Sequence, residues 1–235
     1  MCAKELRQSV QPNALDLEAV VAWQRQRQQE FRETPTDGLE VPYRDRLLRV
    51  YPNVFRPFED SLPLVETMKI RPGDKVLDMG TGAGVIAIYA ALQGASRVMA
   101  VDVNPCAVRT TDENAGRHGV GERVFALESD VYNALNGDRF DVITANLPWL
   151  DRPAADLVQA SQWDTGFNTN RRFLFGLREH LVAGGRAYVA QGNYGALEKF
   201  RATAIQARLL IRQIGLGHFS ENPSLEFYAL ELRPE

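Results

Sequence analysis

The segment Lys75–Gly84 constrains this chain more than any other stretch of its sequence. An apolar run ends at Asp78, and glycines then alternate with other residues before an apolar segment of helical composition. The glycines are Gly80, Gly82 and Gly84. Glycine lets backbone N–H groups approach a ligand that a Cβ atom would exclude, and the following helix N-terminus favours negative charge or lone pairs. The segment predicts a buried strand, a glycine turn and a helix, with a nucleotide-containing cofactor over the turn. A tight turn without a ligand is the alternative.

Length, charge and cysteine content limit the classes of protein. The 235 residues suit one α/β domain with an N-terminal extension. A net charge of −3 argues against a nucleic-acid surface built on bulk electrostatics. Cys2 and Cys106 lie far apart, which predicts neither a disulfide framework nor a metal site and fits a reducing cytoplasm. No apolar run is long enough to span a bilayer, and the first residues lack a signal-peptide core.

Strand-like and helix-like segments alternate from Asp74 to the C-terminus. After the first strand we expect strands at 97–103, 123–130, 140–145 and 186–191, and a final, antiparallel pair at 210–214 and 225–232. The expected helices between them are 104–117, 171–182 and 196–209. This alternation predicts an α/β fold with a Rossmann-like, doubly wound, mostly parallel seven-stranded sheet over residues 71–235.

Residues 1–70 read as an N-terminal helical extension that forms a lid or a homodimer contact. Asn13 is a candidate N-cap for a helix over residues 14–33. Shorter helices are expected at 44–50 and 62–68.

Polar residues mark the ends of four successive predicted strands. Asp78, Asp102, Asp130 and Asn146 occupy these ends, and ligands of open parallel sheets bind at the carboxyl ends of the strands. Asp102 lies about 20 residues beyond the glycine turn, where a carboxylate accepts from ribose hydroxyls. Asp130 is placed to accept from an adenine amino group, with Val131 packing on the ring. The predicted cofactor-binding residues are Asp78, Gly80, Thr81, Gly82, Gly84, Asp102, Val103, Asp130, Val131 and Asn146.

The glycine spacing resembles that of a known family. A dinucleotide fingerprint would place its third glycine at position 85, which is valine, whereas Gly84 comes one position early. With the acids at the strand ends, this shortened pattern resembles motif I of the class I S-adenosylmethionine-dependent methyltransferases, and the resemblance runs from about Arg56 to the C-terminus. It implies S-adenosylmethionine as the cofactor.

The segment Asn146-Leu147-Pro148-Trp149 resembles the Asn-Pro-Pro-aromatic motif of amino-methyltransferases, especially the release-factor glutamine methyltransferase group. The segment 55–60 is similar to the segment that precedes motif I in that group. The resemblance implies that the Asn146 side chain and the Leu147 carbonyl bind the target nitrogen. Pro148 would turn that carbonyl toward the pocket, and Trp149 would stack on the substrate or face the sulfonium. The chain departs from the motif by carrying Leu147 for the first proline and Trp149 for tyrosine or phenylalanine.

These observations predict N-methylation of a small amine or amide. One alternative keeps the cofactor and cyclises it, as azetidine-2-carboxylate synthases do, giving methylthioadenosine and a four-membered imino acid. Another is a catalytically silent module that binds the cofactor. Candidate substrate contacts are Phe55, Phe58, Trp163 and Phe167. We expect a cytoplasmic enzyme without metal.

Overall fold

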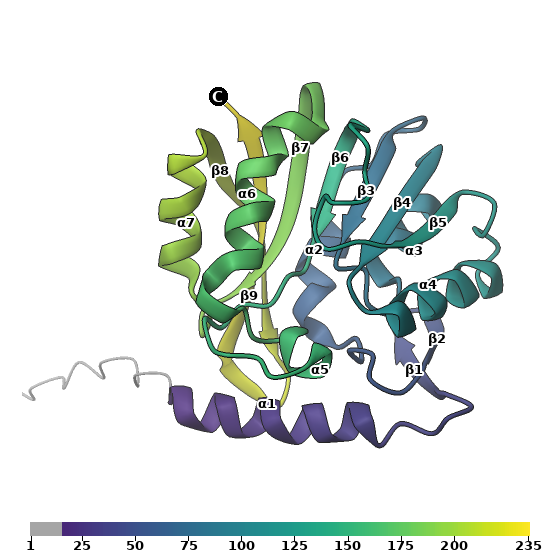
Figure 1. The fold of residues 1–235 in the computed structure, drawn as a ribbon, viewed down its shortest axis with the longest axis vertical. Helices are drawn as coiled ribbons and strands as arrows, with labels where there is room; N and C mark the ends of the chain where they lie inside the picture. The colour runs from purple at the N-terminus through teal and green to yellow at the C-terminus, as the bar shows by residue number, and fades with distance from the viewer. Residues whose placement is uncertain (1–15) are drawn as a thin grey trace, which may run out of the picture.

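The computed structural model describes residues 16–235, which form a seven-stranded sheet flanked by helices (Figure 1). The strands lie in the order β5-β4-β3-β6-β7-β9-β8. The first five are parallel, and β9 is antiparallel to both of its neighbours. Their bounds are β3 Lys75–Met79, β4 Arg97–Asp102, β5 Val124–Glu128, β6 Phe140–Ala145, β7 Leu181–Gly192, β8 Leu209–Phe219 and β9 Asn222–Pro234. The predicted fold class and the antiparallel final pair are therefore confirmed.

Helices cover both faces of the sheet because buried strand residues alternate between two apolar layers. Val76 packs in a cluster with residues of α2 and α3, whereas its neighbour Leu77 packs in a second cluster with residues of α6 and α7. This alternation is expected of a strand buried on both faces. The helices are α2 Leu62–Thr67, α3 Val85–Leu92, α4 Pro105–Arg117, α5 Leu157–Ala160, α6 Asn168–His180 and α7 Leu197–Gln206.

The N-terminal region holds one long helix, α1 Leu17–Arg32, which runs along one end of the sheet beside α5 (Figure 1). Asp16 caps it by accepting hydrogen bonds from the backbone N–H groups of Glu18 and Ala19 at 3.1 and 3.2 Å. The predicted cap Asn13 lies outside the described residues. A hydrogen bond of 2.8 Å joins Arg32, at the other end of α1, to Asp156, the residue before α5.

The helix predicted at 44–50 is wrong, because these residues belong to a β-hairpin. Strand β1 Leu39–Tyr43 pairs with β2 Arg46–Val50 in antiparallel register. Arg44 makes the turn at a φ of 53°. Leu48 and Val50 are buried while Leu47 is half-exposed. The burial therefore follows the two-residue period of a strand, a pattern too short for the sequence to distinguish from a helix.

Most other differences concern where elements begin and end. Strand β7 begins at Leu181, five residues before the predicted start, and a register shift lies between Phe140 and Val142 of its neighbour β6. Because β7 begins there, α6 ends at His180 and the pair Gly184-Gly185 lies inside the strand.

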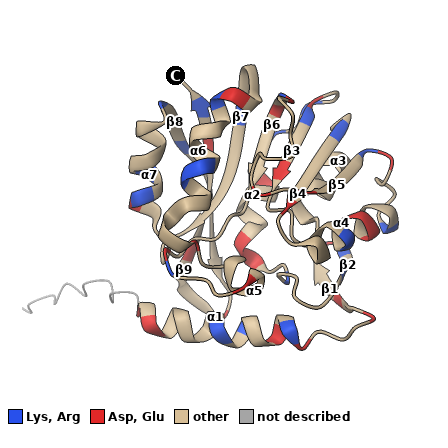
Figure 2. Ribbon diagram, viewed as in Figure 1, with Lys and Arg blue, Asp and Glu red and all other residues tan. Residues whose placement is uncertain are grey.

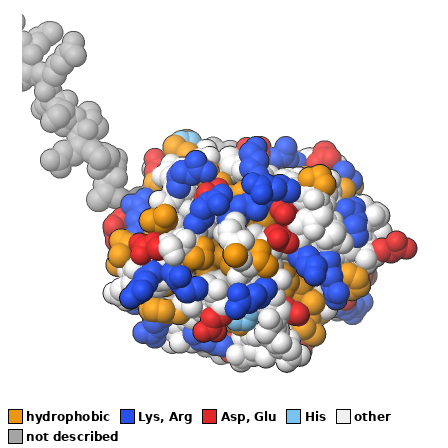
Figure 3. Space-filling model, turned by 90° about the horizontal axis from the view of Figure 1, so that it is seen from above, with side chains coloured by type: hydrophobic (Ala, Val, Ile, Leu, Met, Phe, Trp, Pro, Cys, Tyr) orange, Lys and Arg blue, Asp and Glu red, His pale blue; other side chains and the backbone are white. Residues whose placement is uncertain are grey.

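The described residues contain no helix long and apolar enough to cross a membrane. On the face seen in Figure 3, basic, acidic and apolar side chains are interspersed.

Candidate active site

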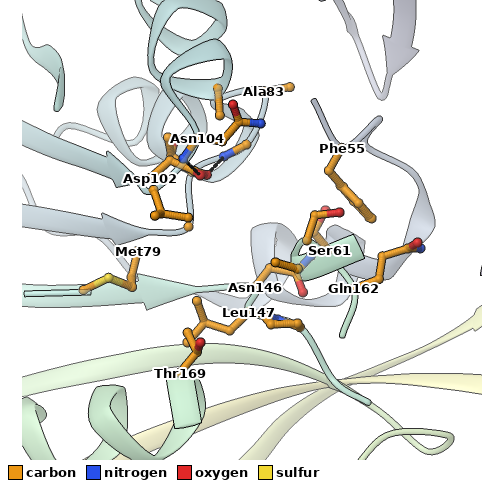
Figure 4. Close-up of a pocket in the computed structure, with 18 of the residues that line it drawn as sticks. Phe55, Ser61, Met79, Ala83, Asp102, Asn104, Asn146, Leu147, Gln162 and Thr169 are labelled. Atoms are coloured by element: carbon orange, nitrogen blue, oxygen red, sulfur yellow. Dashed lines mark hydrogen bonds between the residues drawn. The ribbon is translucent and has the colours of Figure 1, made fainter. Parts of the chain in front are cut away.

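A cavity lies at the carboxyl ends of the parallel strands, and residues of α1 and α5 also line it. The glycine turn after β3, the ends of β4, β5 and β6, and the segment before α2 all contribute to its wall (Figure 4). It is lined by Gln24, Phe55, Pro57, Phe58, Asp60, Ser61, Met79, Gly80, Thr81, Gly82, Ala83, Val85, Ile86, Asp102, Val103, Asn104, Ala107, Ser129, Asp130, Val131, Asn146, Leu147, Pro148, Trp149, Leu157, Ala160, Ser161, Gln162, Thr169 and Tyr194.

The glycine turn lies close to the motif that follows β6. Gly80 has a φ of 70°, and the N–H groups of Gly80 and Thr81 both donate to the Val101 carbonyl, at 2.8 and 3.0 Å. A Cβ atom on Gly80 would lie 3.1 Å from the Leu147 side chain. Glycine is needed here both for the left-handed backbone and for this close approach.

Asp102 presents a carboxylate held by the backbone. One oxygen accepts from the Gly82 N–H at 3.0 Å and the other from the Asn104 N–H at 2.9 Å (Figure 4). Burial raises the pKa of Asp102 above its usual value, although these backbone donors oppose the shift. Each oxygen keeps lone-pair capacity for a further donor, which suits a diol such as ribose.

Asp130 and Val131 lie on the cavity wall after β5. Both carboxylate oxygens of Asp130 accept from Nη1 of Arg172 on α6 at 2.8 Å, so this acid already has a partner. Val131 has a φ of 53°, a conformation that is strained for a β-branched residue. The strained backbone keeps the Val131 side chain buried at the cavity wall.

The side-chain amide of Asn146 is fixed by a carboxylate from another part of the chain. Its Nδ2 donates to Oδ2 of Asp60 at 2.6 Å. Asp60 lies in the 3₁₀ turn η1 Glu59–Ser61 and is only 3% exposed. An ionised carboxylate only accepts hydrogen bonds, so the NH₂ of Asn146 must face it. Oδ1 of Asn146 consequently has no hydrogen-bond partner among the described residues.

The next residues of the motif are held by separate contacts. The Leu147 carbonyl accepts no hydrogen bond within the described chain, whereas the Pro148 carbonyl accepts from Nδ2 of Asn170 at 2.8 Å. Asn170 is fully buried and also donates to Asp164 at 2.9 Å. The turn therefore leaves the Leu147 carbonyl, like Oδ1 of the preceding Asn146, without a hydrogen-bond partner within the described chain.

Trp149 fits a slot formed by two glycines. Its indole N–H donates to the Ala190 carbonyl at 3.1 Å. Cβ atoms on Gly192 and Gly195 would lie within 2.4 and 2.7 Å of Trp149 atoms. The ring is thus buried, and its centroid lies 5.3 Å from that of Tyr194, with the two rings tilted by 52°. These glycines explain how the chain accommodates tryptophan at this position.

Comparison with known proteins places this cavity in a family. A family profile for ribosomal protein L11 methyltransferase (PrmA) matches residues 60–161. A Methanocaldococcus jannaschii protein, provisionally named a protein N5-glutamine methyltransferase, is 32% identical over 152 residues, which cover 62% of this chain and 76% of that relative. The chain belongs to the class I S-adenosylmethionine-dependent methyltransferases.

Other relatives of this methyltransferase carry related names. A release factor glutamine methyltransferase from Bordetella pertussis is 33% identical over 181 residues, which cover 70% of this chain but only 63% of that relative. A ribosomal protein L11 methylase structure from Lactobacillus delbrueckii superposes with a TM-score of 0.59 at 20% identity, covering 82% of this chain and 89% of the other. The structure of a Thermus thermophilus 16S rRNA N2 G1207 methyltransferase, in complex with AdoMet and guanosine, superposes with a TM-score of 0.63 at 20% identity. The match covers 84% of this chain and 50% of the other. At these identities the two structures show a shared fold.

S-adenosylmethionine is the cofactor of this methyltransferase, and its cavity fits the group. The glycine turn lacks the Cβ atoms that would fill the space over the backbone, and Asp102 keeps acceptor capacity beside it.

Several predicted site residues lie outside the cavity wall of the methyltransferase. Asp78 is buried below the glycine turn, where its Oδ1 accepts from Thr144 at 2.8 Å. Gly84 packs against Thr111. The Trp163 indole N–H donates to Gln24 at 2.7 Å. Phe167 is also buried away from the cavity, whereas Phe55 and Phe58 line it.

Three residues of the site were not found by sequence reasoning: Gln24, Asp60 and Asn170. Asp60 had a signal, because it ends the segment that resembles the pre-motif region. Gln24 belongs to a polar run that reads as a solvated helix face, yet it is 3% exposed. Asn170 carried no motif, and only the folded structure brings it to the site. Tyr194 was indicated only by its position just after the predicted strand 186–191, and it lines the cavity.

Proposed function

We propose that this methyltransferase transfers a methyl group to the nitrogen of a small amine or amide. The observation that carries the proposal is the pair of free acceptors, Oδ1 of Asn146 and the Leu147 carbonyl, at the carboxyl end of β6. S-adenosylmethionine supplies an electrophilic methyl group on a sulfonium.

Two acceptors orient a nitrogen better than one. An amine or amide nitrogen that donates one N–H to Asn146 and another to the Leu147 carbonyl has its position and rotation fixed. The protein then also fixes the direction in which the lone pair of an amine nitrogen points. Such alignment contributes several kcal/mol to catalysis without requiring a strong base.

Asp60 acts on this arrangement through Asn146. If the Asn146 amide were free to turn by 180°, its NH₂ would replace the acceptor that the nitrogen needs. The hydrogen bond to Asp60 prevents this, so Asp60 is a positioning residue in the proposed reaction.

The names of the relatives suggest the wider class of acceptor. Three are named for glutamine methylation and others for ribosomal protein L11. Here the cavity wall includes Gln24 of α1, and Leu147 replaces the proline of the motif. Because α1 covers the acceptor side of the cavity, we expect the methyl acceptor to be a small molecule and not a loop of another protein.

The test is product analysis by mass spectrometry. The full chain is incubated with S-adenosylmethionine and a panel of small amines and amides, and the products are compared with those formed by Asn146→Ala. We expect S-adenosylhomocysteine and an N-methylated product from the wild type, with a loss of at least about 100-fold in the variant.

An incubation without acceptor is the control for cyclisation. The proposal predicts intact cofactor, whereas methylthioadenosine would indicate the cyclase chemistry. Methylation on carbon or oxygen, or full activity of Asn146→Ala, would contradict the proposal.

A further inference from the structure

The charge of the cavity wall is one-sided. Its described residues include three carboxylates, Asp60, Asp102 and Asp130, and no lysine, arginine or histidine. Figure 2 shows acidic residues at the ends of β3 and β4, close to the site. Asp102 faces the proposed ribose position, and Asp130 is paired with Arg172. The third carboxylate, Asp60, lies on the acceptor side of the cavity. The adenosyl part of the cofactor does not account for a negative charge at this position.

One oxygen of Asp60 has no partner. Oδ2 accepts from Asn146, but Oδ1 is buried without a hydrogen-bond partner within the described chain. A buried, incompletely paired carboxylate is costly, and burial raises the pKa of Asp60 to about 6. Proteins rarely keep such a group unless a ligand or a reaction uses it.

The surroundings of Asp60 suit an organic cation. Phe55, Phe58, Trp149 and Tyr194 line the same cavity, and the faces of aromatic rings attract positive charge. The Phe55 and Phe58 ring centroids lie 5.8 Å apart. The nearby guanidinium of Arg27 lies 5.0 Å from the Phe58 centroid, but Arg27 lines a neighbouring groove and not this cavity.

We propose that the acceptor is a cationic aliphatic amine, which Asp60 Oδ1 binds as an ammonium and from which it takes the proton. This inference rests on the proposed N-methyl transfer and narrows its substrate class.

Counting donors distinguishes an amine from an amide. A primary ammonium carries three N–H donors, and three acceptors on residues of the cavity wall lack a hydrogen-bond partner within the described chain: Oδ1 of Asn146, the Leu147 carbonyl and the buried Oδ1 of Asp60. A carboxamide NH₂ has two donors, which would leave one acceptor unpaired and would bring the carboxylate no positive charge beyond that of Arg27.

The proton transfer also creates the nucleophile. One N–H bond of the ammonium breaks, the proton passes to Oδ1 of Asp60, and the electron pair stays on nitrogen. The pair first points at Asp60, so inversion at the nitrogen must turn it toward the sulfonium methyl before transfer. The two remaining N–H groups keep their bonds to Asn146 and Leu147. Asp60 releases the proton to solvent before the next turnover. Its raised pKa makes Asp60 a better proton acceptor than an exposed aspartate.

Binding of matched probes tests the proposal without turnover. The full chain, saturated with S-adenosylhomocysteine, is titrated with n-pentylamine and with pentanamide at about pH 7.5 by NMR or calorimetry. At this pH the amine is protonated and the amide is neutral. We expect the amine to bind at least about tenfold more tightly than the amide.

Variants assign the preference to Asp60. Asp60→Asn should abolish the preference for the amine, whereas Glu59→Gln, which removes the same charge one residue away and outside the cavity wall, should retain it. Equal affinities, no detectable binding of the amine, or an unchanged preference in Asp60→Asn would overturn the proposal. If the protein prefers the amide and Asn146→Ala loses methyl transfer, the proposed N-methylation is retained. Only the proposal that the acceptor is a cationic amine is then overturned.

Discussion

At the scale of single residues, the site depends on contacts between segments far apart in the chain. Asn146 is oriented by Asp60, 86 positions earlier, and Asp102 is held by N–H groups of Gly82 and Asn104. Asp102 and Asn146 could be predicted because the ends of parallel strands meet at one edge of a sheet. Asp60 could not be placed, because nothing in the sequence states how its segment folds against β6.

Removing the carboxylate of Asp102 should weaken cofactor binding. Asp102→Ala loses the acceptors proposed for the ribose and also leaves two backbone N–H groups without partners. Charge-assisted hydrogen bonds contribute about 1.5–3 kcal/mol, so we expect S-adenosylhomocysteine affinity to fall by roughly 10- to 150-fold by calorimetry. Asp112→Ala, which removes an exposed carboxylate from α4, serves as the control. Unchanged affinity in Asp102→Ala would exclude Asp102 from the cofactor site.

The protonation of Asp60 should appear in the pH dependence of stability. Its folded pKa of about 6 lies above its ordinary value of 3.8, so between these values the folded state binds more protons than the unfolded state. The unfolding free energy of the wild type should therefore rise as pH falls through about 6, by up to about 3 kcal/mol relative to Asp60→Asn.

Urea unfolding of both proteins between about pH 7.5 and 4 measures this difference. Asp78 and Asp102, whose pKa values are also raised, occur in both proteins and cancel. The pKa of Asp60 is lowered by Asn146, by the backbone of Ser61 and Phe58 and by Arg27, and Tyr43 and Tyr194 lie nearby. The variant leaves all of these groups in place. A wild-type advantage that grows with rising pH would contradict the assignment.

At the scale of elements, α1 completes the cavity wall. Gln24 lines the cavity and accepts from the Trp163 indole, which ties the helix to the insertion after β6. The sequence predicted a helix here as part of a lid or a dimer contact. It did not predict that a residue from its polar run is buried, because the partner Trp163 lies 139 positions away.

The hydrogen bond between Gln24 and Trp163 should contribute more to the free energy of unfolding than a hydrogen bond at the surface. Gln24→Ala leaves a buried indole N–H without an acceptor, which costs about 1–3 kcal/mol. The matched control is Gln26→Ala on the same helix, because Gln26 is exposed and bonds only to Glu30. We expect the control to stay within about 0.5 kcal/mol of the wild type in urea unfolding. Equal effects of the two changes would show that α1 is not anchored at Gln24.

The slot for Trp149 gives a second prediction at this scale. In Gly192→Ala the new Cβ would lie 2.4 Å from the indole ring, so the ring or β7 must shift. Such overpacking costs about 1–3 kcal/mol, and we expect methyl transfer to fall because Trp149 adjoins the two acceptors.

The control for Gly192 is Gly116→Ala, since Gly116 lies in α4 with no atom within 4 Å of a new Cβ. It should stabilise the protein by roughly 0.5–1 kcal/mol. Thermal unfolding and turnover of both variants test whether Gly192 is needed to accommodate Trp149. A Gly192→Ala protein with the stability and turnover of the wild type would contradict this requirement.

At the scale of the whole molecule, the cavity joins the N-terminal helix α1 to segments that follow β3, β4, β5, β6 and β7. Its wall extends from Gln24 of α1 to Tyr194 after β7. The doubly wound, mostly parallel sheet and its antiparallel final pair could be predicted, because alternating strands and helices allow few topologies. The hairpin β1–β2 could not, because five residues of mixed pattern fit either period.

Cofactor binding should stabilise the described chain as one unit. A ligand that binds only the folded state adds about 2.7 kcal/mol at 100 times its dissociation constant. We expect S-adenosylhomocysteine to raise the midpoint of thermal unfolding and to increase hydrogen-exchange protection in both α1 and the glycine turn. Protection limited to the glycine turn would show that α1 does not respond to the cofactor.

The central claim is that the cofactor and the methyl acceptor meet beside Asn146 and Leu147. A crystal structure of the full chain with S-adenosylhomocysteine and n-pentylamine tests it most directly. The account predicts the ribose hydroxyls on Asp102, the sulfur facing the free acceptors, and the amine nitrogen bonded to Asn146 Oδ1, the Leu147 carbonyl and Asp60. A ribose bound away from Asp102, or a sulfur pointing away from Asn146, would contradict it.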